Sequence, residues 1–191
     1  LRRVWSDPPL RRLRLASLAF AATQQSYVTF VVSRLHLELG WTLAAAAGVL
    51  AASQALSVVA RIGFGALADA WAAPGRVLGA LGLAMALGCV ALALPGAATP
   101  AWQAVAAALA CAAFAMGWNG VFFAELALQV RREDMGRIAG ATQFFTFAGG
   151  MAGPLLFGEL VRAGGSYALA YVLIAPVPAV AALTMLRRPA V

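Results

Sequence analysis

The chain has 191 residues, of which 63% are hydrophobic and 11% are charged, and its formal net charge is +7. A soluble domain has about 25% charged residues, and at this length it buries only about 70% of its surface. So much apolar surface is therefore incompatible with water as the main solvent. The composition predicts an all-α polytopic membrane protein, with the lipid bilayer as its first partner.

All fourteen basic residues are Arg, and the pI is near 11.0, a value shared by many nucleic-acid-binding proteins. These Arg residues lie in short clusters between long apolar runs and do not form one polar face, which argues against nucleic acid. The single histidine and the two cysteines, Cys89 and Cys111, show no metal-ligand spacing. We therefore expect no metal, no cofactor and no catalytic residue.

Six segments meet the requirement of a membrane-crossing helix for about 20 mainly apolar residues. The expected spans are 13–32, 41–67, 77–94, 102–130, 138–161 and 167–186. Together they form a transmembrane domain of residues 13–188, preceded by the end of a cytoplasmic loop (1–12) and followed by a cytoplasmic tail (189–191). Pro176 and Pro178 fall inside the last span, where neighbouring helices can satisfy the freed backbone groups.

The distribution of Arg predicts the orientation in the membrane. If the first span starts in the cytoplasm, only Arg34 and Arg162 lie on the opposite side, and the other twelve Arg are cytoplasmic. The positive-inside rule then places both termini in the cytoplasm, which requires an even number of spans. The Ala-rich, Lys-free composition favours a bacterial inner membrane. Because the chain starts at Leu1 and not at Met, we expect it to be a fragment that continues a longer protein upstream.

The end of the second span carries a pattern of glycine and aspartate. Gly65 precedes Asp69 by four positions, and Gly75-Arg76 follow after a short turn. This pattern resembles the loop signature of the major facilitator superfamily, although Ala70 stands where that family has a basic residue. The resemblance implies that Asp69 and Arg76 belong to a gate. The alternative is that they are ordinary loop charges.

Two further stretches extend the resemblance over essentially the whole chain. Residues 117–125 are similar to helix 10 of the superfamily, and residues 136–158 to helix 11. The resemblance implies helices 7 to 12, a C-terminal half built from two three-helix inverted repeats, with the N-terminal six-helix half as its absent partner. Gly153-Pro154 is expected to be a hinge. Glycines in the second, third and fifth spans predict close helix packing.

Polar side chains interrupt three of the spans at one depth, counted at about 1.5 Å of rise per residue. In the superfamily, the corresponding helices line a central cavity. Amide and aromatic side chains in such a place could orient a small polar solute. The alternative is hydrogen bonding between helices, at about 0.6 kcal/mol for each bond. The candidate solute-binding residues are Gln24, Gln25, Tyr27, Gln54, Trp118 and Asn119.

Two charges lie at a similar depth in the cytoplasmic third of the membrane. Arg61 is about 12 Å inside Asp69, and Glu125 is about 9 Å inside Arg131, by helix rise. Because an unpaired charge at that depth is costly, we expect an Arg61–Glu125 ion pair between the second and fourth spans. It could be a static clamp, or a switchable pair in which Glu125 carries a proton or Arg61 contacts an anion. Glu159 and Arg162 are expected to form an ordinary pair on one helix face.

The sequence thus predicts secondary active or facilitative transport of a small polar solute or organic anion by alternating access, with protons as a candidate coupling ion. The alternative is a non-transporting six-span scaffold or a channel-like protein, although the sequence shows no charged ring or filter-like loop. An enzyme is not expected, because no span carries a paired nucleophile and base.

Overall fold

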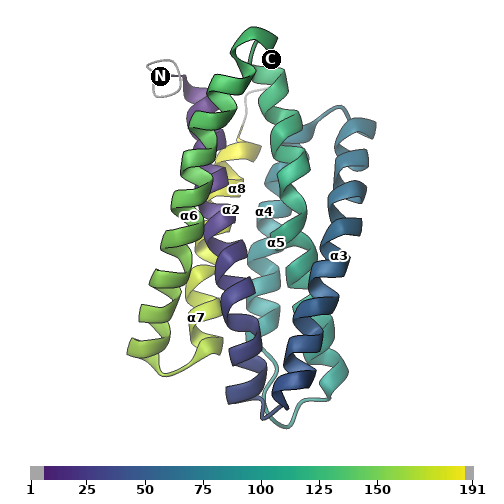
Figure 1. Ribbon diagram of the computed structural model, residues 1–191, viewed down its shortest axis with the longest axis vertical. Coiled ribbons are helices and arrows are strands. Elements are labelled where there is room, and N and C mark those ends of the chain that lie inside the picture. The colour runs from purple at the N-terminus through teal and green to yellow at the C-terminus, as the bar shows by residue number, and fades with distance from the viewer. Residues whose placement is uncertain (1–6, 188–191) are drawn as a thin grey trace.

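The computed structural model describes residues 7–187 as a bundle of helices that run side by side (Figure 1). The elements are α2 (Pro8–Ser33), the π-helical turn η1 (Arg34–Glu38), α3 (Leu43–Ala70), α4 (Pro74–Ala93), α5 (Ala101–Gln129), the 3-10 turn η2 (Arg132–Asp134), α6 (Met135–Gly164), α7 (Tyr167–Ile174) and α8 (Pro176–Leu186). Within the described chain they form six candidate membrane spans, because η1 continues α2, η2 precedes α6, and α7 and α8 together make one span. The predicted all-α, six-span architecture is confirmed.

The first span differs most from its expected limits. It begins at Pro8, not at residue 13, because Pro8 and Pro9 occupy the first helical positions, where a fixed φ suits a helix. At its other end the helix continues through η1, where a loop was expected. Residues 1–6 of the expected loop and the expected tail 189–191 lie outside the described residues, as do Arg2, Arg3 and Arg188.

The last span is divided at Ala175 into α7 and α8. Pro176 has no N–H and occupies the first position of α8, so the hydrogen-bond ladder is interrupted there. The N-terminus of α7 is capped by Ser166, whose side chain accepts a hydrogen bond from the backbone N–H of Leu169 at 3.2 Å. The two short helices therefore act as one broken span.

The helices form two layers in Figure 1. A front row runs α6, α2, α5 and α3, while α4, α7 and α8 lie behind it. The start of α2 and the end of α8 lie at the same end of the bundle, as an even number of spans requires. We call this the Arg-rich end, because it carries Arg11, Arg12, Arg76, Arg131 and Arg132. The opposite end carries Arg34 and Arg162.

The core lies where the front row meets the helices behind it. Large side chains such as Leu13, Phe20, Leu78 and Trp118 are at most 1% exposed there. By contrast, α3 and α6 are the least buried of the six spans. Their outward faces are apolar, and on α6 the exposed large side chains are Phe144, Phe147, Met151, Leu155 and Leu156. These two helices therefore present faces that only lipid or another protein surface can cover.

Glycines bring α6 into backbone contact with α2. A Cβ atom on Gly149 would overlap the carbonyl oxygen of Leu18, and one on Gly153 would overlap that of Ala22. The predicted packing of glycines in the third span is also confirmed, since a Cβ on Gly88 would lie 2.8 Å from Cα of Cys111. The prediction is wrong within the second span, where a Cβ on Gly63 or on Gly65 would meet open space.

We expect Gly149→Ala and Gly153→Ala to destabilise the protein by about 1–3 kcal/mol each, because the added methyl group would force α6 away from the carbonyls of Leu18 and Ala22. Gly150→Ala is the matched control, since a Cβ there meets open space. Thermal unfolding of the purified protein in detergent measures the difference. Equal melting temperatures for the three variants would contradict this account of the α2–α6 contact.

Candidate solute-binding groove

An open groove of about 560 Å³ lies between α2, α5 and α6. It is lined by Ala21, Gln24, Gln25, Asn119, Thr146, Phe147, Gly150 and Met151. Three of the candidate residues from the sequence, namely Gln24, Gln25 and Asn119, meet here although they come from two helices. The wall thus offers three amides and one hydroxyl among apolar groups, and none of its side chains is ionisable.

Trp118 sets the orientation of Gln24. Its Nε1–H donates to Oε1 of Gln24 at 2.9 Å. The indole is 1% exposed and packs edge-on against Phe20 and Phe122, with ring centroids 5.7 and 5.6 Å away. Because Oε1 accepts this bond, the amide NH₂ of Gln24 is the group left to donate toward a solute. Trp118 therefore supports the groove wall from behind and is not itself part of the lining.

Helix α6 supplies the wall that the sequence reasoning missed. The buried hydroxyl of Thr146 lines the groove and has no hydrogen-bond partner among the described residues. Phe147 is 67% exposed beside it. An unsatisfied buried hydroxyl calls for an explanation, and a ligand that hydrogen-bonds to it is one. Thr146 is a polar interruption in the middle of its span, the signal that singled out the residues of α2 and α5.

Tyr27 and Gln54 lie outside the groove lining. Tyr27 is fully buried, and its hydroxyl lies 2.7 Å from Oγ of Ser53 and donates to the carbonyl of Ala108 at 3.1 Å. It therefore joins α2, α3 and α5, which is the interhelical alternative stated for this set of residues. Gln54 is exposed on α3. One position separates it from the buried Ser53, and that step rotates a side chain by about 100° around a helix.

The expected Arg61–Glu125 ion pair is not formed. Arg61 is exposed and donates from Nε to the carbonyl of Met116 at 3.0 Å. Met116 precedes Glu125 on α5 by about 13 Å of helix rise. Glu125 is 1% exposed and faces the start of α4, where a Cβ on Gly75 would lie 2.9 Å from its Oε2. The expectation of a similar depth also fails, since the carbonyl of Arg61 lies beside Gly120 of α5, five residues before Glu125.

The position of Glu125 has its own electrostatic reason. The N-terminus of a helix favours a negative charge, and the carboxylate lies at the first turn of α4. Nε2 of Gln129, one turn later on α5, donates to Oε1 of Glu125 at 2.6 Å. The buried acid is thus stabilised by a helix terminus and by hydrogen bonding.

The two signature residues lie at the Arg-rich end. Asp69 is in the last turn of α3, Arg76 is in the first turn of α4, and both are exposed. Within residues 7–187 neither of them forms an ion pair. Asp69 borders a depression of about 260 Å³ beside Ala72, which has a left-handed φ of 47°. Their gating role remains a prediction.

The expected hinge lies within a continuous helix. Pro154 is inside α6, which extends without a break from Met135 to Gly164. Gly153 has a packing reason of its own, its contact with the backbone of Ala22. The hinge therefore also remains a prediction.

Comparisons with known proteins agree with this architecture. A family model described as Major Facilitator Superfamily matches residues 1–154. No curated protein matches the sequence. The fold is similar to a crystal structure described as the E. coli fucose:proton symporter FucP, with a TM-score of 0.83, and to FucP described as a Major Facilitator Superfamily transporter in the outward conformation, with a TM-score of 0.84. Each match is 21% identical, covering 100% of this chain and 45% of the FucP chain, so the chain spans less than half of that length.

We expect Tyr27→Phe to lower the stability of the protein by about 1 kcal/mol, because the hydroxyl group joins three helices. Tyr171→Phe is the control, because the buried hydroxyl of Tyr171 has no hydrogen-bond partner among the described residues. Thermal unfolding compares the two variants, and uptake assays check that Tyr27→Phe leaves solute affinity unchanged. If Tyr27→Phe instead raised KM and left stability unchanged, Tyr27 would be a residue of the solute site.

Proposed function

We propose that this chain, which belongs to the Major Facilitator Superfamily, supplies the C-terminal six-helix half of a transporter whose groove holds a small, uncharged polar solute during alternating access. The observation that carries the proposal is the chemistry of the groove wall. Its amides and its buried hydroxyl can donate and accept hydrogen bonds, and no charge accompanies them. Such a wall suits a hydroxyl-rich solute.

The position of Arg61 favours a neutral solute over an organic anion. Arg61 is the cation on which the prediction of an anionic solute rests. It lies outside the groove lining, and its Nε donates to the backbone carbonyl of Met116. A fucose:proton symporter shares the fold. At 21% identity that likeness does not identify a substrate, but its sugar belongs to the class of solute that the wall suits.

The faces of α3 and α6 support the presence of a second half. Both helices expose apolar side chains, and Gly63 and Gly65 of α3 have open space around them. Small residues allow helices of another bundle to approach closely. We propose that the N-terminal half docks on these faces and completes the groove. Asp69 and Arg76 would then gate the Arg-rich end, which we assign to the cytoplasm by the positive-inside rule.

Glu125 is the candidate proton carrier on this chain. It is the one carboxylate that is buried among the described residues. Its position at the start of α4, outside the groove lining, would make its protonation act on helix packing and not directly on the solute.

The test is an uptake assay with the intact protein in proteoliposomes. The solutes are labelled neutral monosaccharides and polyols, with L-fucose included, and labelled monocarboxylates for comparison. We expect uptake of at least one neutral solute and none of the carboxylates. Uptake of a carboxylate that Arg61→Gln abolishes would overturn the assignment of the solute class, whereas no uptake of any solute would count against transport itself.

For the solute so identified, we expect Gln25→Leu, Asn119→Leu and Thr146→Val each to raise KM about threefold to tenfold, because each removes one hydrogen bond worth about 0.5–1.5 kcal/mol. Gln103→Leu is the control, because this amide is exposed at the start of α5, outside the groove lining. An equal effect of Gln103→Leu would show that the groove is not the binding site.

A further inference from the structure

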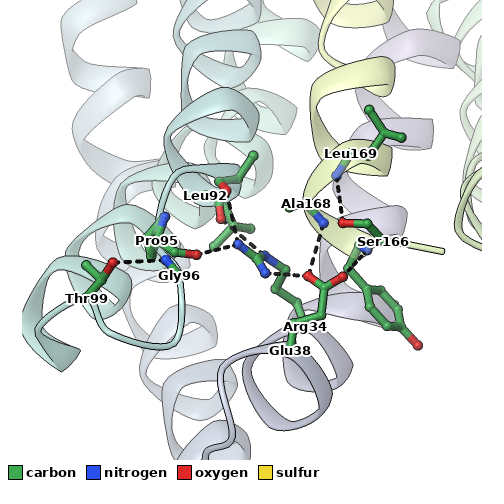
Figure 2. A network of polar contacts seen from close by, with 11 residues as sticks. Arg34, Glu38, Leu92, Pro95, Gly96, Thr99, Ser166, Ala168 and Leu169 are labelled. Carbon is green, nitrogen blue, oxygen red and sulfur yellow. Dashed lines mark hydrogen bonds and ion pairs between the residues drawn. The ribbon is translucent and has the colours of Figure 1, made fainter. Parts of the chain in front are cut away.

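Arg34 lies at the end of the bundle opposite the Arg-rich end, and it is only 3% exposed. Its guanidinium group reaches the C-terminus of α4 (Figure 2). Nε donates to the carbonyl of Leu92 at 3.4 Å, and Nη2 donates to the carbonyls of Ala93 at 3.1 Å and Pro95 at 2.7 Å. One cation thus accounts for three backbone acceptors at a helix terminus.

The last carbonyls of a helix lack intrahelical donors, and here the sequence removes further candidates. Pro95 has no N–H group, and the N–H of Gly96 donates to Oγ1 of Thr99 at 2.9 Å (Figure 2). A positive charge at a helix C-terminus is also favoured by the macrodipole. Arg34 therefore suits the C-terminus of α4 in two ways: its N–H groups donate to the free carbonyls, and its positive charge complements the helix dipole.

Glu38 makes the complementary contact at another helix. It forms an ion pair with Arg34, and its Oε1 and Oε2 accept hydrogen bonds from the backbone N–H groups of Tyr167 at 2.6 Å and Ala168 at 3.2 Å. These are the first two residues of α7, where the macrodipole favours a negative charge. Figure 2 shows the pair lying between the loop after α4 and the start of α7.

Both charges belong to the π-helical turn η1 that ends the first span. Turns of this kind are rare in proteins, and those that occur are often found at functional sites. Within one turn of backbone, η1 presents a cation to the end of one helix and an anion to the start of another. It thereby joins α2, α4 and α7, which the chain connects only through long intervening segments.

We propose that Arg34 and Glu38 form a polarity-specific clamp that makes the ends of α2, α4 and α7 one rigid body. Opening of the bundle at this end would then involve α3, the start of α5 and the end of α6, or a movement of the whole half. The clamp itself does not depend on the solute. Only the statement about opening rests on the proposed transport function.

The polarity distinguishes this clamp from an ordinary salt bridge. Exchanging the two charges would keep an ion pair, but it would present a carboxylate to the α4 carbonyls and a guanidinium to the α7 amides. An ordinary pair tolerates such an exchange, whereas the clamp does not. Glu159 and Arg162 provide a matched control, since they form a pair on α6 with exposures of 64% and 75% near the same end.

The experiment is amide hydrogen exchange on the intact protein, read at Tyr167 and Ala168. We expect Glu38→Arg and Arg34→Glu each to speed exchange of these amides about tenfold or more, because local opening sets the rate. In the variant that carries both Arg34→Glu and Glu38→Arg, these amides should exchange at least as fast as in either single variant. The control variant, in which Glu159 and Arg162 swap charges, should leave the amides of Tyr167 and Ala168 protected. Recovery of wild-type protection in the combined Arg34–Glu38 variant would overturn the clamp.

The unaltered protein supplies a second measurement if the variants fail to fold. The Tyr167 and Ala168 amides should be protected about a hundredfold relative to an unstructured chain, because they are bonded to Glu38. If these two amides were unprotected in the folded wild-type protein, the proposal would be wrong, and no substitution would be needed to show it. Neither measurement requires uptake, so failure of the clamp and failure of the transport proposal are separate results.

Discussion

The backbone contact between α2 and α6 is the constraint on which the groove depends. In lipid there is no hydrophobic drive between helices, so close approach must come from dispersion and from contacts such as Cα–H···O. Gly149 and Gly153 allow that approach over Leu18 and Ala22. Gly150, which lies between the two in sequence, lines the groove itself. The same turn of α6 therefore sets both the spacing of the two helices and the shape of the wall.

Three of the buried and half-buried charges lie at helix ends and not in the groove. Glu125 lies at the start of α4, Arg34 lies at its end, and Glu38 lies at the start of α7. Each sign complements the local dipole, so α4 has an anion at its N-terminus and a cation at its C-terminus. In a medium of low dielectric constant these contacts are stronger than in water. Electrostatics thus serve the assembly of the bundle and leave the groove wall neutral.

The spans and their order could be predicted because length and apolarity are properties of the sequence itself. The side chains that face each other could not, because counting helix rise from the end of a span gives neither the offset between neighbouring helices nor the direction around each helix. Arg61 lies beside Gly120 of α5, five residues before Glu125, and donates to the carbonyl of Met116, whereas Glu125 faces the start of α4. Likewise, the buried Ser53 bonds to Tyr27 while the adjacent Gln54 is exposed. Only packing decides such directions.

Under the proposed transport function, the neutrality of the groove wall also limits how this chain could couple transport to an ion gradient. A proton that bound at Glu125 would change the charge at the start of α4, where Arg76 lies and where the short connection from Asp69 and α3 arrives. It would leave the hydrogen-bonding pattern of Gln24, Gln25 and Asn119 as it is. Coupling through this chain would therefore act on the Arg-rich end of the bundle. Any direct competition between a proton and the solute would have to arise from residues outside the groove wall described here.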